Sequence, residues 1–164
     1  MQKFFLGLTI LIIFIIGAVY GVLFTKAGNS FVGSYIENKV NDEQNDVKLK
    51  VNDFTLTFNT INFDASINDN SNINIAGDLK IFQKKVDVKY DIKINELSKL
   101  ENLTKQKLNG PFSTSGIFKG DANFSEIKGI SDIAQSETSY ELKLIDFEPK
   151  NIDFLVKNAR IEKL

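Results

Sequence analysis

The sequence predicts a mainly β protein in which an N-terminal transmembrane helix and a short amphipathic helix precede a curved antiparallel sheet. Three observations support this fold class. An uncharged apolar segment lies near the start of the chain, a helical spacing of apolar residues follows it, and from Val47 onward apolar and polar residues alternate with period two. We expect about seven to nine strands that form an open groove or a partial barrel.

The apolar segment, residues 4–24, contains no charged side chain and lies between Lys3 and Lys26. At ~1.5 Å per residue such a helix is about 31 Å long, which matches a hydrocarbon core of ~30 Å and exceeds the apolar part of a cleaved signal peptide. Residues 1–26 are therefore interpreted as a cytoplasmic N-terminus and an uncleaved signal anchor.

Two glycines in this segment, Gly17 and Gly21, have the G-x-x-x-G spacing. This spacing lets two helix backbones approach closely, so it predicts a helix-dimer seam. Glycine is also common in membrane helices, and the alternative interpretation is that both glycines are tolerated without a role in dimerisation.

The juxtamembrane segment, residues 27–45, is predicted to break at Gly28 and to form an amphipathic helix over residues 30–42. The apolar side of this helix consists of Phe31, Val32, Tyr35, Ile36 and Val40. It rests either on the membrane interface or on the end of the following domain. Acidic residues on the polar side favour docking on the domain, because helices that bind membrane surfaces are usually rich in basic residues.

Residues 46–164 are predicted to form one β domain. The alternation changes phase after Asn52-Asp53, which indicates a tight turn or a bulge. The strands are predicted around residues 47–51, 54–58, 61–67, 73–81, 86–94, 112–124, 140–144 and 152–156. A three-residue spacing of leucines predicts a short helix over residues 96–107 that crosses or closes one end of the sheet, and glycines on the apolar side of residues 112–124 are expected to leave space there.

Composition excludes several kinds of chemistry. The chain has no Cys, His or Trp and a formal net charge of −1. Thiol nucleophiles, imidazole bases and Cys/His zinc sites are therefore impossible, and the charge balance does not favour nucleic acid as a partner. The oxygen-rich loop at residues 69–74 lacks the glycine and the terminal Glu of an EF-hand. We expect no enzyme activity, no catalytic residue, no metal and no cofactor.

A sheet with one apolar side either closes on itself around a dry core or stays open as a groove for an apolar ligand. The same alternation is expected in both cases. Isoleucines, phenylalanines and glycines on the apolar side, a lack of helices to cover it and the membrane tether favour the groove. The residues predicted to contact lipid acyl chains are Val88, Tyr90, Ile92, Phe112, Phe118, Phe124, Leu142 and Leu144.

The order of anchor, short helix and one-sided strands resembles the layout of the AsmA-like envelope protein family. The most specific part is the series Leu108-Asn109-Gly110, Gly116, Gly120-Asp121 and Gly129, followed by the strand at residues 140–144 and the tail at residues 149–164. The resemblance implies a single-pass protein of the bacterial inner membrane with a periplasmic β groove that handles phospholipid or maintains the outer membrane. Eight strands stack to only about 38 Å, so the chain alone is not expected to bridge two membranes.

Two alternatives remain open. In the first, the domain has a dry core and acts without catalysis as a scaffold or assembly partner that docks other envelope proteins along an edge strand. In the second, the chain resembles the single-span lipopolysaccharide-export component, whose periplasmic jellyroll passes on acyl chains.

Overall fold

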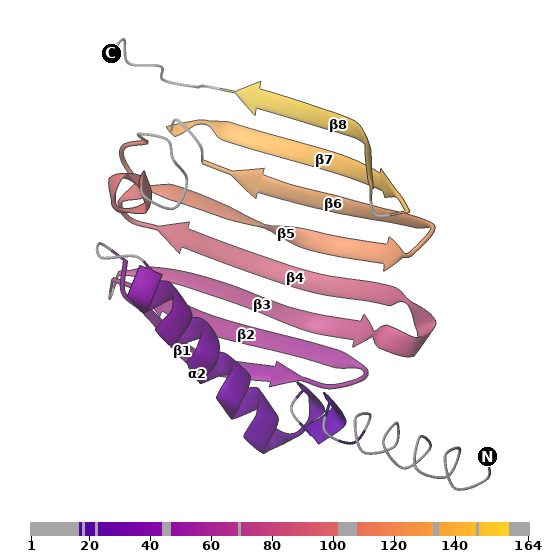
Figure 1. Cartoon of the computed structure of the whole chain (residues 1–164). Coiled ribbons are helices and arrows are strands. Elements are labelled where there is room, and N and C mark those ends of the chain that lie inside the picture. The colour runs from indigo at the N-terminus through magenta and orange to yellow at the C-terminus, as the bar shows by residue number, and fades with distance from the viewer. Residues whose placement is uncertain are drawn as a thin grey trace, which may run out of the picture.

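The protein forms one antiparallel sheet of eight strands whose spatial order equals their order in the chain (Figure 1). The computed structural model describes residues 17, 19–21, 23–43, 47–68, 70–101, 108–132, 135–146 and 148–157. Helix α2 precedes the sheet, and two short 3-10 helices connect strands. The elements are α2 Lys26–Glu43, β1 Leu49–Leu56, β2 Thr60–Ile67, β3 Ser71–Lys80, η1 Ile81–Gln83, β4 Lys85–Ile94, η2 Leu97–Leu100, β5 Phe112–Asp121, β6 Phe124–Ser131, β7 Glu137–Ile145 and β8 Glu148–Lys157.

The mainly β, antiparallel and open architecture confirms the predicted fold class, and eight strands fall within the expected number. Most of the predicted membrane span, including residues 4–16, lies outside the described residues. In the described part of the chain, no helix has both the length and the apolar character that crossing a membrane requires. The anchor and the Gly17–Gly21 seam therefore stay predictions, although added Cβ atoms on either glycine would have open space around them.

Helix α2 begins at Lys26, and the chain bends at Thr25 rather than at Gly28 as predicted. The Thr25 hydroxyl accepts a hydrogen bond of 3.1 Å from the backbone N–H of Gly28, which caps the helix at its N-terminus. Gly28 can therefore remain inside the helix, where it is buried. Gly33 brings the helix close to the sheet, because a Cβ on it would lie 3.3 Å from side-chain atoms of Val51 and Phe54.

Docking of this helix on the domain is confirmed. Ile36 and Val40 pack against a core cluster formed by Val47, Leu49, Ala65, Ile67, Ile94 and Leu100. Phe31 and Tyr35, which were predicted on the same side, are exposed instead. The reason is that polar residues of α2 also face the sheet, so only part of the apolar arc is buried.

The outer edge of β1 is closed by three side chains of α2. The Asn41 side chain accepts from the N–H of Leu49 at 2.7 Å and donates to its carbonyl oxygen at 2.9 Å. Asn29 makes the same pair of bonds to Leu56, at 3.2 and 3.1 Å, and a carboxylate oxygen of Glu37 accepts from the N–H of Val51 at 2.9 Å. These side chains occupy backbone groups that would otherwise pair with another strand.

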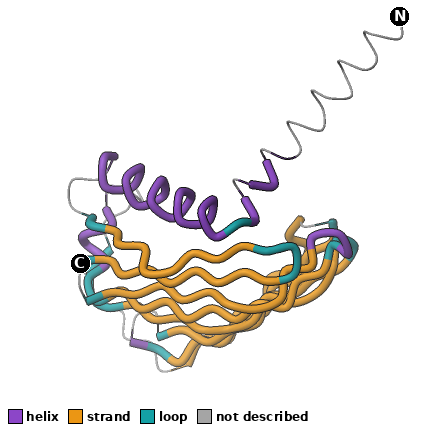
Figure 2. The backbone as a smooth tube through the Cα atoms, turned by 90° about the horizontal axis from the view of Figure 1, so that it is seen from below, coloured by secondary structure: helices purple, strands orange, loops and turns teal. Residues whose placement is uncertain are grey.

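The change of phase at Asn52-Asp53 is a bulge inside one strand, since the register of β1 against β2 shifts between Val51 and Asp53. From β2 onward the strands pair in continuous register as far as a second shift after Lys143. α2 lies on only one face of this sheet (Figure 2). That face carries the apolar residues, and the opposite face carries most of the charged ones.

Residues 112–124, predicted as one strand, are the β5–β6 hairpin. Gly120 pairs with Ser125, which leaves Ala122 and Asn123 as a two-residue turn. The residue numbers of directly opposite residues then differ by an odd number. Even-numbered residues of β5 therefore share a face with odd-numbered residues of β6. Ser125 therefore points to the apolar face and Phe124 to the opposite one, and the predicted placement of Phe124 is wrong.

Candidate functional site

The side of β4–β8 that faces α2 carries an apolar surface that the described residues leave largely uncovered. α2 packs over the β1 side, and η2 packs at one end of β4 and β5 against Ile94 and Phe112, whereas no helix among the described residues lies over the rest of these strands. We use the name apolar face for the side chains that point to the same side as α2 on these five strands. Its large members are Val88, Tyr90, Ile92, Phe118, Ile127, Tyr140, Leu142, Leu144, Ile152, Phe154 and Val156.

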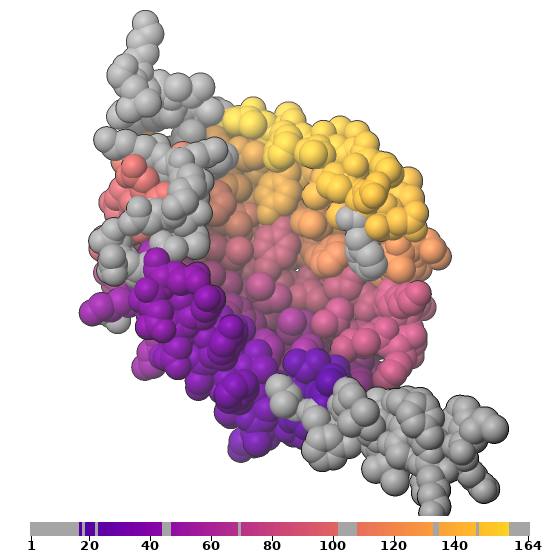
Figure 3. All heavy atoms as spheres, in the orientation of Figure 1, coloured from indigo at the N-terminus to yellow at the C-terminus, as the bar shows by residue number. Residues whose placement is uncertain are grey.

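Exposure on this face is greatest on its last strand, β8. Val88 and Leu144 are buried, Phe118 and Leu142 are half-buried, and Phe154 on β8 is 68% exposed. In Figure 3 the centre of the face lies deeper than α2 on one side and β8 on the other. The apolar face is therefore an open, hollowed surface with α2 as one wall and β8 as its free rim.

The space above Gly116 and Gly129 is filled. The register places Tyr90, Gly116, Gly129 and Tyr140 in one row across four strands. A Cβ on Gly129 would meet the hydroxyl and ring atoms of Tyr140 and the hydroxyl of Tyr90, so both rings lie over the glycines. The expectation that these glycines leave room for a ligand is corrected: the tyrosine rings occupy that room and form the floor.

The two tyrosine hydroxyls belong to one hydrogen-bond chain. The Thr114 hydroxyl donates to the carbonyl oxygen of Ile130 at 3.0 Å and lies 2.6 Å from the Tyr140 hydroxyl, which in turn lies 2.6 Å from that of Tyr90. Because each hydroxyl has one proton, Tyr140 donates to Thr114 and Tyr90 donates to Tyr140. Burial, followed by this bond, raises the pKa of Tyr90. These hydrogen bonds satisfy the hydroxyl groups of Thr114, Tyr140 and Tyr90. The tyrosines therefore present ring surface, and not an acid or a base, to a molecule on the apolar face.

Seven of the eight residues predicted to contact lipid share this side of the sheet, and Phe124 does not. Phe112 lies at its far end, where it packs against the core cluster. Prediction missed Ile127, Tyr140, Ile152, Phe154 and Val156. The alternation at residues 140–144 and 152–156 was visible, and the register was needed to place these residues in line with Val88 and Tyr90.

The predicted helix at residues 96–107 is in part the 3-10 helix η2. Glu96 caps it, since its carboxylate accepts from the backbone N–H of Ser98 at 3.4 Å. The bond from the Ser98 hydroxyl at 3.0 Å, followed by the bonds from the Ser98 and Gly110 N–H groups, holds the pKa of Glu96 below its ordinary value. Leu97 and Leu100 pack at the end of the sheet with Ile94 and Phe112. The Leu103 part lies outside the described residues.

The opposite face is polar, and several of its charged side chains form ion pairs. Lys119 lies 2.9 Å from Asp87, and Lys128 lies 3.0 Å from Glu126. This face has a hollow of about 480 Å³ over β4–β8, and most of the residues that line it have hydroxyl or charged side chains. Two exposed apolar side chains, Ile130 and Leu155, also line it. Among the described residues, no group of three acidic side chains is placed to hold a metal ion.

Three comparisons with known proteins found no match: none with a protein-family model, none with a curated protein and none with a solved structure.

Proposed function

We propose that this chain is a membrane-anchored, non-enzymatic protein that binds the acyl chains of membrane lipids on its apolar face. The observation that carries the proposal is the uncovered apolar surface of β4–β8, bounded by α2 and the exposed strand β8. The anchor predicted over residues 1–26 keeps this surface beside a lipid bilayer. AsmA-like lipid handling at the periplasmic side of a bacterial inner membrane is the corresponding cellular role.

The physical argument starts from the cost of an uncovered apolar surface. Leaving one large apolar side chain in water instead of burying it forgoes about 1.5–3 kcal/mol. Ile152, Phe154 and Val156 all stand more than half exposed on one side of β8. An apolar occupant recovers part of this free energy, and soluble proteins rarely retain such a surface without a partner.

The dimensions suit an acyl chain. Ten-residue strands such as β4, β5 and β8 are ~33 Å long, and five adjacent strands are ~19 Å wide. One acyl chain spans half of a ~30 Å hydrocarbon core, or ~15 Å. The apolar face accommodates an extended chain in either direction, and the tyrosine floor presents no unpaired polar group to it.

The test compares two adjacent residues of β8. Phe154 points to the apolar face and Leu155 to the polar face, and both are more than half exposed. We would place the photoreactive amino acid p-benzoylphenylalanine at position 154 or at position 155 of the full chain in cells. After irradiation, mass spectrometry identifies what is attached to the protein.

We expect lipid adducts at position 154 and none above background at position 155. In a further pair of variants the photoreactive residue replaces Phe118 on the apolar face. There, Phe154→Asp is expected to weaken lipid labelling, whereas Leu155→Asp leaves it unchanged. Equal lipid labelling at positions 154 and 155, or none at either, refutes the proposal. A lipopolysaccharide adduct instead of phospholipid favours the jellyroll alternative.

A second candidate function, scaffolding by protein contact, is favoured by one observation. Every residue of β8 is exposed, and within the described residues no strand pairs with its outer edge, whereas α2 caps the edge of β1. Strand addition by another envelope protein is thus possible at β8 alone. Adducts to a protein rather than to lipid at both positions would support this function.

A further inference from the structure

The connections at one end of the sheet carry large apolar side chains. This near end consists of the β1–β2, β3–β4, β5–β6 and β7–β8 turns, and Tyr20 and Phe24 lie beside the first of them (Figure 1). Phe58 is in the first turn, Phe82 in η1, and Phe124 and Ile145 flank the other two. Phe82 is 79% exposed, and Phe124 and Ile145, which face each other on β6 and β7, are nearly half exposed.

The far end has a different composition. Its β2–β3 turn contains Asn68 and Asn70, and its β6–β7 connection contains Asp132 and Ser136. Within the described part of the far-end connections, Leu108 is the exposed large apolar side chain. Exposed apolar side chains that were distributed at random would occur at both ends of the sheet, whereas those of the described turns are concentrated at the near end.

Rings from the N-terminal helical segment stack on the near end. Phe24 lies 4.3 Å from Phe58 and Tyr20 lies 5.5 Å from Phe58, measured between ring centroids. Phe58 in turn lies 4.8 Å from Phe82. Since Phe24 is the last residue of the predicted span, this aromatic cluster brings the β1–β2 and β3–β4 turns to the depth where the span leaves the bilayer.

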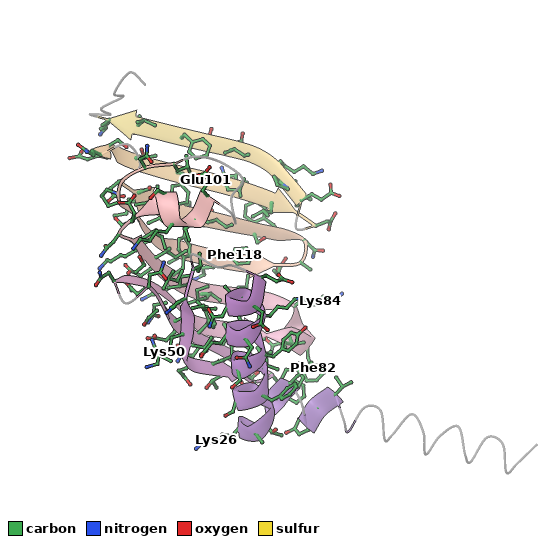
Figure 4. All side chains as sticks on the ribbon, turned by 60° about the vertical axis from the view of Figure 1, so that its left-hand side comes forward. Lys26, Lys50, Phe82, Lys84, Glu101 and Phe118 are labelled. Carbon is green, nitrogen blue, oxygen red and sulfur yellow. The ribbon has the colours of Figure 1, made fainter. Side chains whose placement is uncertain are left out.

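Charged groups fit the same location. Lys84 and Lys85 follow Phe82 after Gln83 and are exposed, and Lys84 lies near Phe82 at the tip of the β3–β4 hairpin (Figure 4). Aromatic rings at headgroup level with lysines next to them are typical of a membrane interface. The carboxylate of Asp121 is turned back onto its own hairpin, where it accepts from the N–H groups of Asn123 and Phe124.

We propose that the near end of the sheet inserts into the membrane interface through Phe82 and Phe124, so that the strands stand upright and the apolar face opens at the bilayer. This inference rests on the anchor in the proposed function. It assigns the route by which an acyl chain enters: along the strands from the near end. The alternative, in which the apolar face lies flat on the bilayer, is disfavoured because α2 projects from that face (Figure 2).

The test uses the absence of Trp from the chain. The full chain is reconstituted into phosphatidylethanolamine–phosphatidylglycerol vesicles that contain a lipid brominated on its acyl chains, which quenches tryptophan fluorescence on contact. The probes are Phe82→Trp and Phe124→Trp at the near end. The matched controls are Asn70→Trp at the far end and Tyr35→Trp on the exposed side of α2. All four positions are exposed, so the substitutions are compatible with folding.

We expect quenching at positions 82 and 124 that is several-fold stronger than at positions 35 and 70. Quenching at position 35 or 70 as strong as at 82 overturns the upright orientation, and weak quenching at both 82 and 124 overturns the insertion. Vesicle flotation separates these results from failure of the anchor. Protein that does not float refutes the anchor, whereas protein that floats with unquenched near-end probes refutes only this inference.

Discussion

Asn41 acts toward Leu49 as a neighbouring strand would, because its amide group bonds both the N–H and the carbonyl oxygen of Leu49. With Asn29 and Glu37 it closes the β1 edge of the sheet. The sheet of the described residues therefore has one protected edge at β1 and one edge, at β8, with no strand beside it. Any further strand adds beside β8 and lengthens the apolar face on its exposed side.

Replacing Asn41 with Leu is expected to open the protected edge. The variant leaves two half-buried backbone groups without partners, at a cost of about 1–3 kcal/mol in the free energy of unfolding. Unpaired strand edges also promote association. Urea unfolding followed by circular dichroism in micelles measures the first effect, and light scattering the second. Asn38→Leu, at an exposed position of the same helix, is the control, and equal effects of both changes would contradict the edge-capping role.

The hydrogen-bond chain through Tyr90 predicts a late tyrosine titration. Burial and the bond to Tyr140 raise the pKa of Tyr90 above its ordinary value of 10.0, so the neutral form is favoured in the folded state. Stability is fully present below pH 10.0 and declines as the pH rises above it. The chain has four tyrosines and no Trp, so absorbance near the tyrosinate band follows the titration clearly.

In that titration, Tyr90→Phe is expected to remove the last step and to reduce the alkaline loss of stability. Tyr140→Phe removes the acceptor and is expected to move the Tyr90 step toward lower pH. A Tyr90→Phe protein that retains the last step would show that another tyrosine is responsible.

Gly129 is expected to tolerate a methyl group only when the tyrosine above it is shortened. Gly129→Ala places its Cβ against the Tyr140 and Tyr90 side chains and is expected to cost about 1–3 kcal/mol. In a Tyr140→Leu background the cost is expected to shrink, which a double-mutant cycle on urea midpoints measures. Gly116→Ala is the contrast, because its Cβ also meets the backbone oxygen of Lys128, which no side-chain change moves. Additive effects of the Gly129 and Tyr140 substitutions would contradict the packing of the Tyr140 ring over Gly129.

Alternation along single strands was sufficient to predict most of the apolar face. Val88, Tyr90 and Ile92 lie on one strand and share a side as predicted, because strand geometry alone decides their direction. Phe124 was misplaced because a two-residue turn reverses parity, and neither Ala122 nor Asn123 is a strong hairpin signal.

Two other features depend on tertiary contacts that no local pattern contains. Asn29, Glu37 and Asn41 lie on one side of α2, and polar residues with this spacing are usually solvated. Their role at β1 becomes visible only when the helix is docked. Likewise, the exposure of Phe154 depends on whether a second layer covers β8, and the alternation in a covered strand would be the same.

The hydrogen bonds of the Asp121 carboxylate are expected to make the stability of the β5–β6 hairpin fall at acidic pH. This hairpin carries Phe124 at the near end. Its carboxylate accepts from the N–H groups of Phe124 and Asn123, which lowers its pKa below the ordinary value of 3.8. A lowered folded-state pKa means that the contribution to stability is present above about pH 4 and is lost as the pH falls through the folded value. The pKa of Glu96 at η2 is also lowered, first by the bond from the Ser98 side chain and then by backbone N–H bonds.

Asp121→Asn is expected to lower the urea midpoint at neutral pH and to flatten its decline below pH 4, because the neutral amide accepts more weakly and does not titrate. Glu96→Gln is the matched variant at the far end. The double variant is expected to show a smaller acid decline of the urea midpoint than either single variant, since the two sites are distant and their effects add.

Quenching of Phe124→Trp by brominated lipid in the Asp121→Asn background tests whether this turn positions the ring in the membrane. If the hairpin positions the ring, quenching falls while that of Phe82→Trp is unchanged. A full acid decline in Asp121→Asn would show that other carboxylates control the transition.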